Sequence, residues 1–226
     1  MGYLFAQDYK ALIQVDSLSQ IIGQDTSLLM KAELAAQAEI TSYLIQKYEL
    51  SKEFTDTVVW AHATSYKAKN RVYLDATSYS ASATYALNSL ALVTGNVYRC
   101  STAVTVAEAF NAAKWTLLGP QYSLYYVTNP EADWDYYAEY SVGDKVWFGD
   151  KVYTAVASNI ALKPSLTPSV WGSGTAYSVA AGTAPTDTTK WTAGDNRNQQ
   201  LVNYLVDVVL YHLHSRIAPR NIPELR

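Results

Sequence analysis

The chain has 226 residues, of which 49% are hydrophobic and 16% are charged, so it is long enough for one large or two modest domains with a packed core. Its net charge of −3 includes no basic stripe, which excludes tight binding to nucleic acid through phosphate contacts. Because Cys100 is the single cysteine, an intrachain disulfide and a thiolate zinc site are excluded as well.

The chain is poor in charge and rich in aromatic residues, with 19 tyrosines and 6 tryptophans. Tyr and Trp are enriched at protein interfaces, but Tyr also fills the faces of β-sheets, and the composition leaves both readings open. The N-terminus predicts no signal peptide, Ala6 argues against myristoylation, and we expect no membrane span.

The first helical region starts with a short lead-in over residues 3–22, followed by a turn at Gly23. Ser27–Tyr48 is predicted to be an amphipathic helix, because apolar residues recur at three- and four-residue spacing. Its four alanines between residues 32 and 38 would allow another helix to approach closely. The apolar run Val58-Val59-Trp60 either closes this helical unit or starts a sheet.

The middle of the chain predicts a tandem pair of small β modules. Tyr85 precedes Tyr98 by 13 residues, and Tyr140 precedes Tyr153 by the same distance. A two-residue hairpin signal lies between the tyrosines of each pair, and a tryptophan follows each pair, at Trp115 and Trp171. The predicted hairpins are Leu90–Val93 with Val97–Ser101 and Lys145–Phe148 with Val152–Val156. Trp191 is a third aromatic landmark, and we interpret the stretch 172–190 before it as a loop that extends the second module.

The last predicted helix runs from Asn198 to Ala218, where Pro219 ends it. It is apolar on more than one face, so we expect it to pack on the N-terminal helix and on a neighbouring subunit. One face holds Leu201, Leu205, Val208 and His212, and the other holds Val202, Val206, Val209, Leu213 and Ile217.

The predicted fold class is α+β: a helical bundle adaptor domain formed by both termini, interrupted by an inserted tandem of small antiparallel β modules. The expected boundaries are 1–64 for the first part of the helical domain, 65–128 and 129–195 for the two modules, and 196–226 for the second helical part.

Known patterns of catalytic or metal-binding residues are not recognised in the sequence. His212 and His214 would point about 200° apart on a helix and cannot share a metal, and His62 stands alone. The carboxylates at residues 131–139 could mimic a paired-carboxylate site or bind Ca²⁺, but an acidic surface loop is the better reading. We therefore expect no enzyme activity, no cofactor and no metal, and we expect Cys100 to be packed in a strand.

The segment Ala38–Tyr48, paired with Val206–Arg216, resembles the small helical head-tail connector (adaptor or head-completion) proteins of tailed phages, especially the Mu-like prophage group. The resemblance covers roughly 90 residues. It implies a homo-oligomeric ring, typically a dodecamer, that docks on the portal protein and contacts the tail or further neck proteins. Genomic DNA would pass through the channel without specific binding, and no membrane would be involved.

The resemblance also implies a location and an interface. The protein would be a structural virion protein of the neck, assembled in the host cytoplasm. The β insert departs from the family pattern, and so does the C-terminus after Pro223, where such proteins usually add a further helix. The candidate portal or subunit interface comprises Leu205, Val209, Leu213, Arg216, Ile217, Arg220 and Arg226.

The second module has a resemblance of its own. The pattern from Tyr140 through Gly143 and Asp144 to Tyr153, followed by Pro164 and Trp171, is similar to small chitin- and cellulose-type carbohydrate-binding modules. In those modules, exposed aromatic side chains stack on sugar rings, which makes Trp147, Tyr153 and Trp171 the candidates here. A carbohydrate-binding protein that attaches to a host or surface glycan is therefore the alternative function. The favoured reading is a collar or a contact with another virion protein.

Overall fold

The chain leaves one structural unit after Val58 and returns to it at Asp195. The computed structural model describes residues 3–23, 25–44 and 53–216. Within it, Met1–Val58 and Asp195–Arg226 form the helical unit, and Val59–Gly194 forms the β unit.

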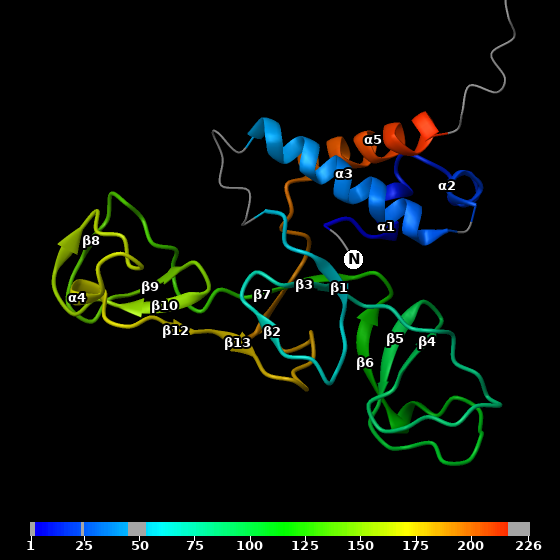
Figure 1. Ribbon diagram of the computed structural model, residues 1–226. Helices are drawn as coiled ribbons and strands as arrows, with labels where there is room; N and C mark the ends of the chain where they lie inside the picture. The colour runs from blue at the N-terminus through cyan, green and yellow to red at the C-terminus, as the bar shows by residue number, and fades with distance from the viewer. Residues whose placement is uncertain (1–2, 24, 45–52, 217–226) are drawn as a thin grey trace, which may run out of the picture. The chain divides into compact units, whose positions relative to one another are not determined.

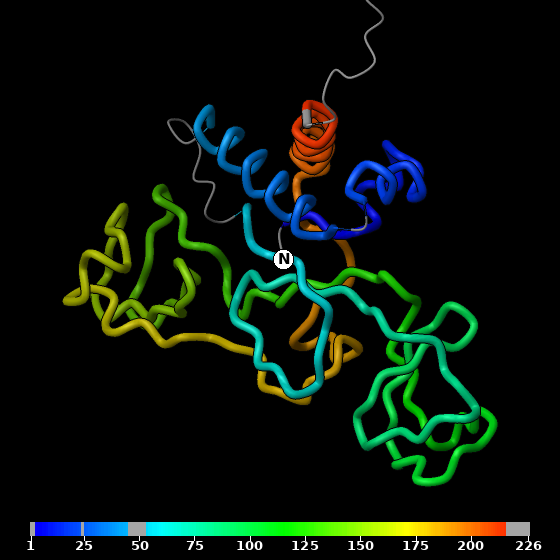
Figure 2. Tube along the Cα trace, turned by 45° about the vertical axis from the view of Figure 1, so that its right-hand side comes forward, coloured from blue at the N-terminus to red at the C-terminus, as the bar shows by residue number. Residues whose placement is uncertain are grey.

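The helical unit contains two short helices, α1 (Ala6–Tyr9) and α2 (Val15–Ile22), and two long ones, α3 (Thr26–Leu44) and α5 (Gln199–Arg216). Gly23 ends α2 in a left-handed conformation with φ of 56°, which glycine adopts readily. Figures 1 and 2 both show α3 beside α5. The buried core of the unit is apolar and consists of Tyr3, Leu4, Tyr9, Ile22, Ala32, Ala36, Val202, Leu205, Val206, Val209 and Leu213.

The expected helical bundle formed by both termini is wrong. The chain is α+β, but the five α-helices of the described residues are not arranged as such a bundle. Only α3 and α5 are long, α1 has 4 residues and α2 has 8, and α4 (Pro168–Trp171) belongs to the β unit. The physical reason lies in residues 3–23, where an early glycine stop and a short apolar stretch leave no third helix long enough to complete a bundle.

The β unit is built from short strands in several small sheets. The apolar run at Val58 belongs to a strand, β1 (Thr57–Val59), and so starts a sheet. The four-stranded sheet has the order β1-β3-β7-β14, with β3 at Arg71–Tyr73, β7 at Leu124–Val127 and β14 at Trp191–Ala193. One three-stranded sheet has the order β4-β5-β6, with β4 at Leu90–Val93, β5 at Asn96–Cys100 and β6 at Trp115–Pro120.

The remaining strands form one more three-stranded sheet and two pairs. The sheet has the order β12-β10-β9, with β9 at Lys145–Phe148, β10 at Lys151–Thr154 and β12 at Thr175–Ala176. The pairs are β11 (Asn159–Ile160) with β8 (Glu139–Tyr140), and β13 (Ser178–Val179) with β2 (Tyr66–Lys67). A short 3₁₀ helix, Ala112–Lys114, precedes β6.

Three modules of one plan occur in the β unit, rather than a tandem of two. In each, a tyrosine hydroxyl accepts a hydrogen bond of 2.7 Å from the backbone N–H five residues earlier and lies near the carbonyl of that same residue. The tyrosines are Tyr66, Tyr85 and Tyr140. We call residues 75–121 module A, residues 129–177 module B, and the discontinuous set 59–74, 122–128 and 178–194 module C.

A tryptophan meets the hydroxyl-bonded tyrosine edge-to-face in every module. The ring centroids are 5.2 Å apart for Trp115 and Tyr85 in module A, and 4.9 Å apart for Trp171 and Tyr140 in module B. Trp191 is 5.2 Å from Tyr66 in module C. Trp191 is therefore the core tryptophan of a third module.

The backbone repeats the same plan. The residue three positions after each tyrosine has a positive φ, which is 64° at Lys69, 68° at Asn88 and 96° at Gly143. In chain order, module A lies in the connection between β3 and β7 of module C, and module B lies between β7 and β13. Both insertions therefore occur at turns of module C, and turns tolerate added chain at small entropic cost.

Candidate functional site

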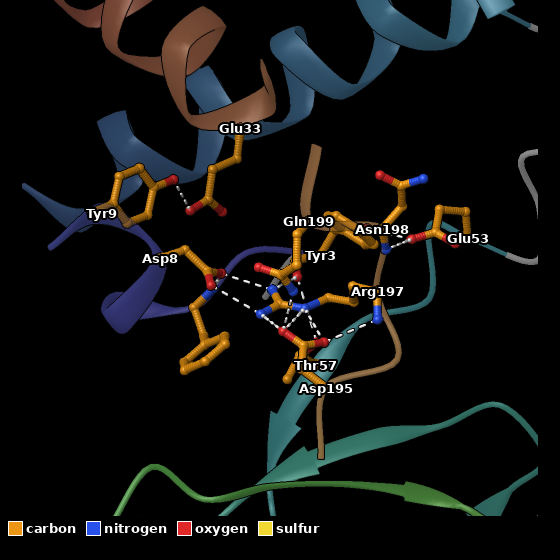
Figure 3. A network of polar contacts seen from close by, with 11 residues as sticks. Tyr3, Asp8, Tyr9, Glu33, Glu53, Thr57, Asp195, Arg197, Asn198 and Gln199 are labelled. Atoms are coloured by element: carbon orange, nitrogen blue, oxygen red, sulfur yellow. Dashed lines mark hydrogen bonds and ion pairs between the residues drawn. The ribbon is translucent and has the colours of Figure 1, made fainter. Parts of the chain in front are cut away.

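The densest polar network of the helical unit surrounds Arg197, whose side chain is 1% exposed (Figure 3). Its two terminal nitrogens donate to both carboxylate oxygens of Asp8, at 2.7 and 2.9 Å. It also donates to Asp195, at 2.7 Å from Nη2 and 2.9 Å from Nε, and to the carbonyl of Tyr3 at 3.0 Å. The guanidinium lies over the Phe5 ring at 4.8 Å. We call this set of contacts the Arg197 clasp.

Electrostatic interactions in the clasp favour the charged forms of Arg197 and Asp195. Burial alone would lower the pKa of Arg197, but hydrogen bonds and charge from Asp195 and Asp8 outweigh burial and raise the pKa. Burial alone would raise the pKa of Asp195, but the hydrogen bonds and charge of Arg197 hold that pKa below its usual value. A buried arginine with bidentate carboxylate partners on two sides is a fixed link between the segments that carry them.

The clasp lies where the chain leaves and returns to the helical unit. The carbonyl of Tyr3 accepts from Arg197 and also from the Thr57 hydroxyl, at 3.4 Å. The Glu53 carboxylate accepts from the Asn198 backbone N–H at 2.8 Å and from the Tyr3 hydroxyl. The outgoing segment, the returning segment and the N-terminal segment are thus tied together within one unit.

A second buried polar pair joins α1 to α3. The Tyr9 hydroxyl donates to the Glu33 carboxylate at 2.6 Å, and Tyr9 is 2% exposed. Burial raises the pKa of Glu33 and outweighs the Tyr9 hydrogen bond, which lowers that pKa; the charges of Asp8 and Asp56 make smaller contributions in the same direction as burial. Burial and the carboxylates of Glu33 and Asp8 raise the pKa of Tyr9, so its hydroxyl stays a donor.

Glu33→Gln is expected to flatten the pH dependence of stability. A group whose folded pKa is raised adds stability that is complete below its unfolded pKa, about 4.3 for Glu, and that is lost as pH rises through the folded pKa. Glutamine still accepts from Tyr9 and carries no charge, so the variant should gain stability over wild type at neutral pH and match it near pH ~4. Urea unfolding across this range checks the result. The exposed Asp16→Asn variant is the control, and an unchanged pH slope in Glu33→Gln would contradict the expectation.

The predicted interface residues of the last helix divide into two groups. Leu205, Val209 and Leu213 are 1%, 0% and 3% exposed, because they pack in the core of their own unit. They therefore do not present a surface to a neighbour. Arg216 is the last residue of α5, and Ile217, Arg220 and Arg226 lie outside the described residues.

The outward face of α3 carries exposed aliphatic side chains, and the outward face of α5 carries exposed tyrosines among polar residues. On α3 the exposed large side chains are Met30, Leu34 and Tyr43, and on α5 they are Tyr204 and Tyr211. Only three of the 19 residues of α3 are charged. A sparsely charged helix face with exposed aliphatic and tyrosine side chains is typical of a protein–protein contact.

The three sugar-stacking candidates lie in the core of module B. Trp147 is 1% exposed, Tyr153 8% and Trp171 0%. The indole N–H of Trp171 donates to the Leu162 carbonyl at 2.7 Å, and a Cβ at Gly174 would clash with the Tyr153 ring at 2.5 Å. These three side chains hold the module together, so they do not form a face on which a sugar ring could stack.

The other residues weighed for chemistry have ordinary partners. His212 contacts Glu39 across α5 and α3 at 3.1 Å, and His62 contacts Arg99 at 3.3 Å. Cys100 is buried in β5. Over residues 3–23, 25–44 and 53–216, no group of His, Cys, Asp and Glu is arranged to hold a metal ion. No helix of this described part is long and apolar enough to cross a membrane.

No protein-family model matches the chain, and no curated protein matches it either.

Sequence reasoning missed the clasp and the third module. Arg197 and Asp8 are 189 residues apart, and nothing in their local sequence links them. A signal for the third module was present: an aromatic residue stands six positions before each module tyrosine, as Trp60, Tyr79 and Trp134. That spacing is shared by all three modules and could have revealed module C.

Proposed function

We propose that the chain is a structural virion protein, a head-tail connector subunit that forms a ring in the phage neck and docks on the portal. The observation that carries the proposal is the pairing of α3 with α5. The described parts of the segments that resemble the connector family, Ala38–Leu44 and Val206–Arg216, fall on these two helices. The helices pack on each other in one unit although the β unit separates them in sequence. The Glu39–His212 contact lies between the same two segments.

The outward faces of α3 and α5 support the same function. Met30, Leu34 and Tyr211 are 45%, 57% and 70% exposed, which provides apolar area that a neighbouring subunit or the portal would cover. In a ring of identical copies, each subunit contacts the next one head-to-tail, and the last contact closes the ring. The net charge of −3 suits a channel through which DNA passes without binding.

The Arg197 clasp ties together the segments of the helical unit between which the β unit is inserted. The helices of this unit would make the ring contacts, and the β unit would serve as a collar. A helical unit that is already ordered loses less entropy on assembly.

The test is the mass and shape of the purified chain, with and without portal, by mass photometry and negative-stain imaging. We expect a ring, or a monomer that becomes a ring when portal is added. Leu34→Glu should prevent ring formation without loss of helical circular dichroism, because it places a charge in the contact. Leu166→Glu is the matched control, since Leu166 is 73% exposed in module B, and it should leave the ring intact. A stable monomer indifferent to portal, or a ring that tolerates Leu34→Glu, would overturn the proposal.

A further inference from the structure

A cleft of about 500 Å³ lies between modules A and C, within the β unit. One wall comes from the loop before the core tyrosine of module C, and the other comes from the turn after the core tyrosine of module A and the start of β4. The lining residues are Trp60, Ala61, His62, Ala63, Leu87, Asn88, Ser89 and Leu90. Five of them are apolar, and Leu87 is 57% exposed. A concave, mostly apolar surface with a few polar groups is the usual form of a small-molecule site.

The side chain of Arg99 lies on the sheet face beside this cleft. Its neighbours in β5, Tyr98 and Cys100, pack in the core of module A. Arg99 points to the opposite face, because side chains alternate along a strand. It pairs with Leu90 in the ladder between β4 and β5, and directly paired residues share a face. Its Nη1 donates to Nδ1 of His62, at 3.3 Å, so the guanidinium reaches the edge of the cleft.

The charge of Arg99 lacks a counter-ion in the described part of the chain. Residues 76–107 contain no other charged residue. A guanidinium has five N–H donors, and His62 takes one of them, while Nε is buried without a hydrogen-bond partner among the described residues. Charges that are withdrawn from water are normally paired, because an unpaired one costs free energy. An anion in the cleft would supply the missing acceptor.

The other modules build the same plan without these two polar side chains. Thr154 follows the second tyrosine of module B as Arg99 follows that of module A. Ala81 stands in module A at the position, four residues before the core tyrosine, that His62 occupies in module C. The module plan therefore requires neither side chain, and their meeting at 3.3 Å belongs to this cleft alone.

We propose that the cleft binds an organic carboxylate, with its carboxylate group on the Arg99 guanidinium and its apolar part on Leu87 and Leu90. Arginine presents N–H groups in a fork that matches a carboxylate. The apolar lining favours an anion with a hydrocarbon part over inorganic phosphate. The carboxylate belongs to a free acid or to the end of a peptide. The inference goes beyond the proposed ring, because the whole cleft lies in one chain and a monomer would bind as a ring does.

The test is a titration of the isotopically labelled full-length chain with sodium phenylacetate, followed by amide chemical shifts in nuclear magnetic resonance. We expect the shifts to concentrate at residues 60–63 and 87–90. Phenylacetamide has a similar shape without the charge, and it should bind about tenfold more weakly or worse. Acetate and inorganic phosphate carry charge without a hydrocarbon ring, and both should also bind more weakly than phenylacetate.

Three variants separate the site from the fold. Arg99→Thr places the module B residue in the strand and should weaken phenylacetate binding about tenfold or more. It should unfold at no lower urea concentration than wild type, because it removes a charge without a counter-ion. Leu87→Ser should weaken the binding of phenylacetate but not of acetate. Val106→Ser, at a 74% exposed position of module A, is the matched control and should bind like wild type.

Three results would overturn the inference: no shifts at residues 60–63 and 87–90, equal affinity for phenylacetate and phenylacetamide, or full binding by Arg99→Thr. The tripeptide Gly-Gly-Phe with a free carboxylate identifies the source of the ligand. Tighter binding of this peptide than of phenylacetate supports a peptide end, and weaker or equal binding supports a free acid.

Portal added to the same preparations keeps this inference apart from the proposed function. A chain that forms the ring but does not bind phenylacetate would reject the carboxylate site and leave the connector function standing. A chain that binds phenylacetate at the cleft but stays a monomer with portal would reject the connector function and leave the site standing.

Discussion

Arg197→Leu is expected to destabilise the helical unit by about 3–5 kcal/mol, the cost of breaking a buried ion pair from one side. The substitution leaves Asp8 and Asp195 without the cation that holds them, and it removes the shorter of two hydrogen bonds to the Tyr3 carbonyl. Leucine fills part of the space, but its burial does not offset the free-energy cost of two buried carboxylates without a partner. The N-terminal segment should therefore detach from the returning segment at Asp195.

Hydrogen exchange in α5 and urea unfolding followed by helical circular dichroism measure this effect on the helical unit alone, which matters because a chain of two units need not unfold in one step. Arg197→Lys keeps the charge but cannot form the bidentate hydrogen bonds, so it should destabilise the helical unit less than Arg197→Leu does. Lys31→Leu, at an exposed position of α3, is the control and should change stability by about 0.5 kcal/mol or less. A loss below about 1 kcal/mol in Arg197→Leu would contradict the role of the clasp, since surface ion pairs contribute that little.

Lowering the pH should destabilise the helical unit through the contact between Arg197 and Asp195. Asp195 has a lowered folded pKa, so its contribution is present above its unfolded pKa, about 3.9, and is lost as pH falls through the lower folded value. Arg197→Leu removes the side-chain hydrogen bonds and the charge that lower the pKa of Asp195, and only the backbone N–H of residue 197 and the Gln199 amide still favour the carboxylate. The variant should then lose less stability than wild type on acidification through this range, although it starts from a lower value.

Periodic and turn patterns were enough to predict the local elements. The helix expected at Ser27–Tyr48 is α3, which the structure describes to Leu44, and the one expected at Asn198–Ala218 is α5. The hairpin expected at Leu90–Val93 is β4 with β5, and the one at Lys145–Phe148 is β9 with β10. These elements depend on neighbouring residues, whose spacing the sequence displays directly.

Long-range organisation was harder to predict. Module C is assembled from three pieces separated by modules A and B, so its repeat is interrupted where the other two are continuous. The bundle expectation failed because periodicity says which residues are apolar but not how many long helices share a core. The sugar-stacking expectation for Trp147, Tyr153 and Trp171 depended on exposure, and an aromatic pattern is the same whether the ring is in a core or on a surface.

Trp171→Ala is expected to destabilise module B by about 3–5 kcal/mol, as large-to-small changes at fully buried aromatic positions do. The side chain is 0% exposed, meets Tyr140 edge-to-face at 4.9 Å, and donates its indole N–H to Leu162 at 2.7 Å. Hydrogen exchange and limited proteolysis of residues 129–177 follow the loss within the module. Leu166→Ala, at a 73% exposed position, is the control and should leave protection unchanged.

Modules A and C provide a comparison for the role of Trp171. Trp115 and Trp191 occupy the same place against Tyr85 and Tyr66, but their indole nitrogens have no hydrogen-bond partner among the described residues. Replacing each tryptophan with phenylalanine should then cost module B more than modules A and C, by the value of one buried hydrogen bond, about 1 kcal/mol. Trp171→Ala that keeps full protection would mean that the ring is not part of the core, and the question of a sugar-stacking face would return with it.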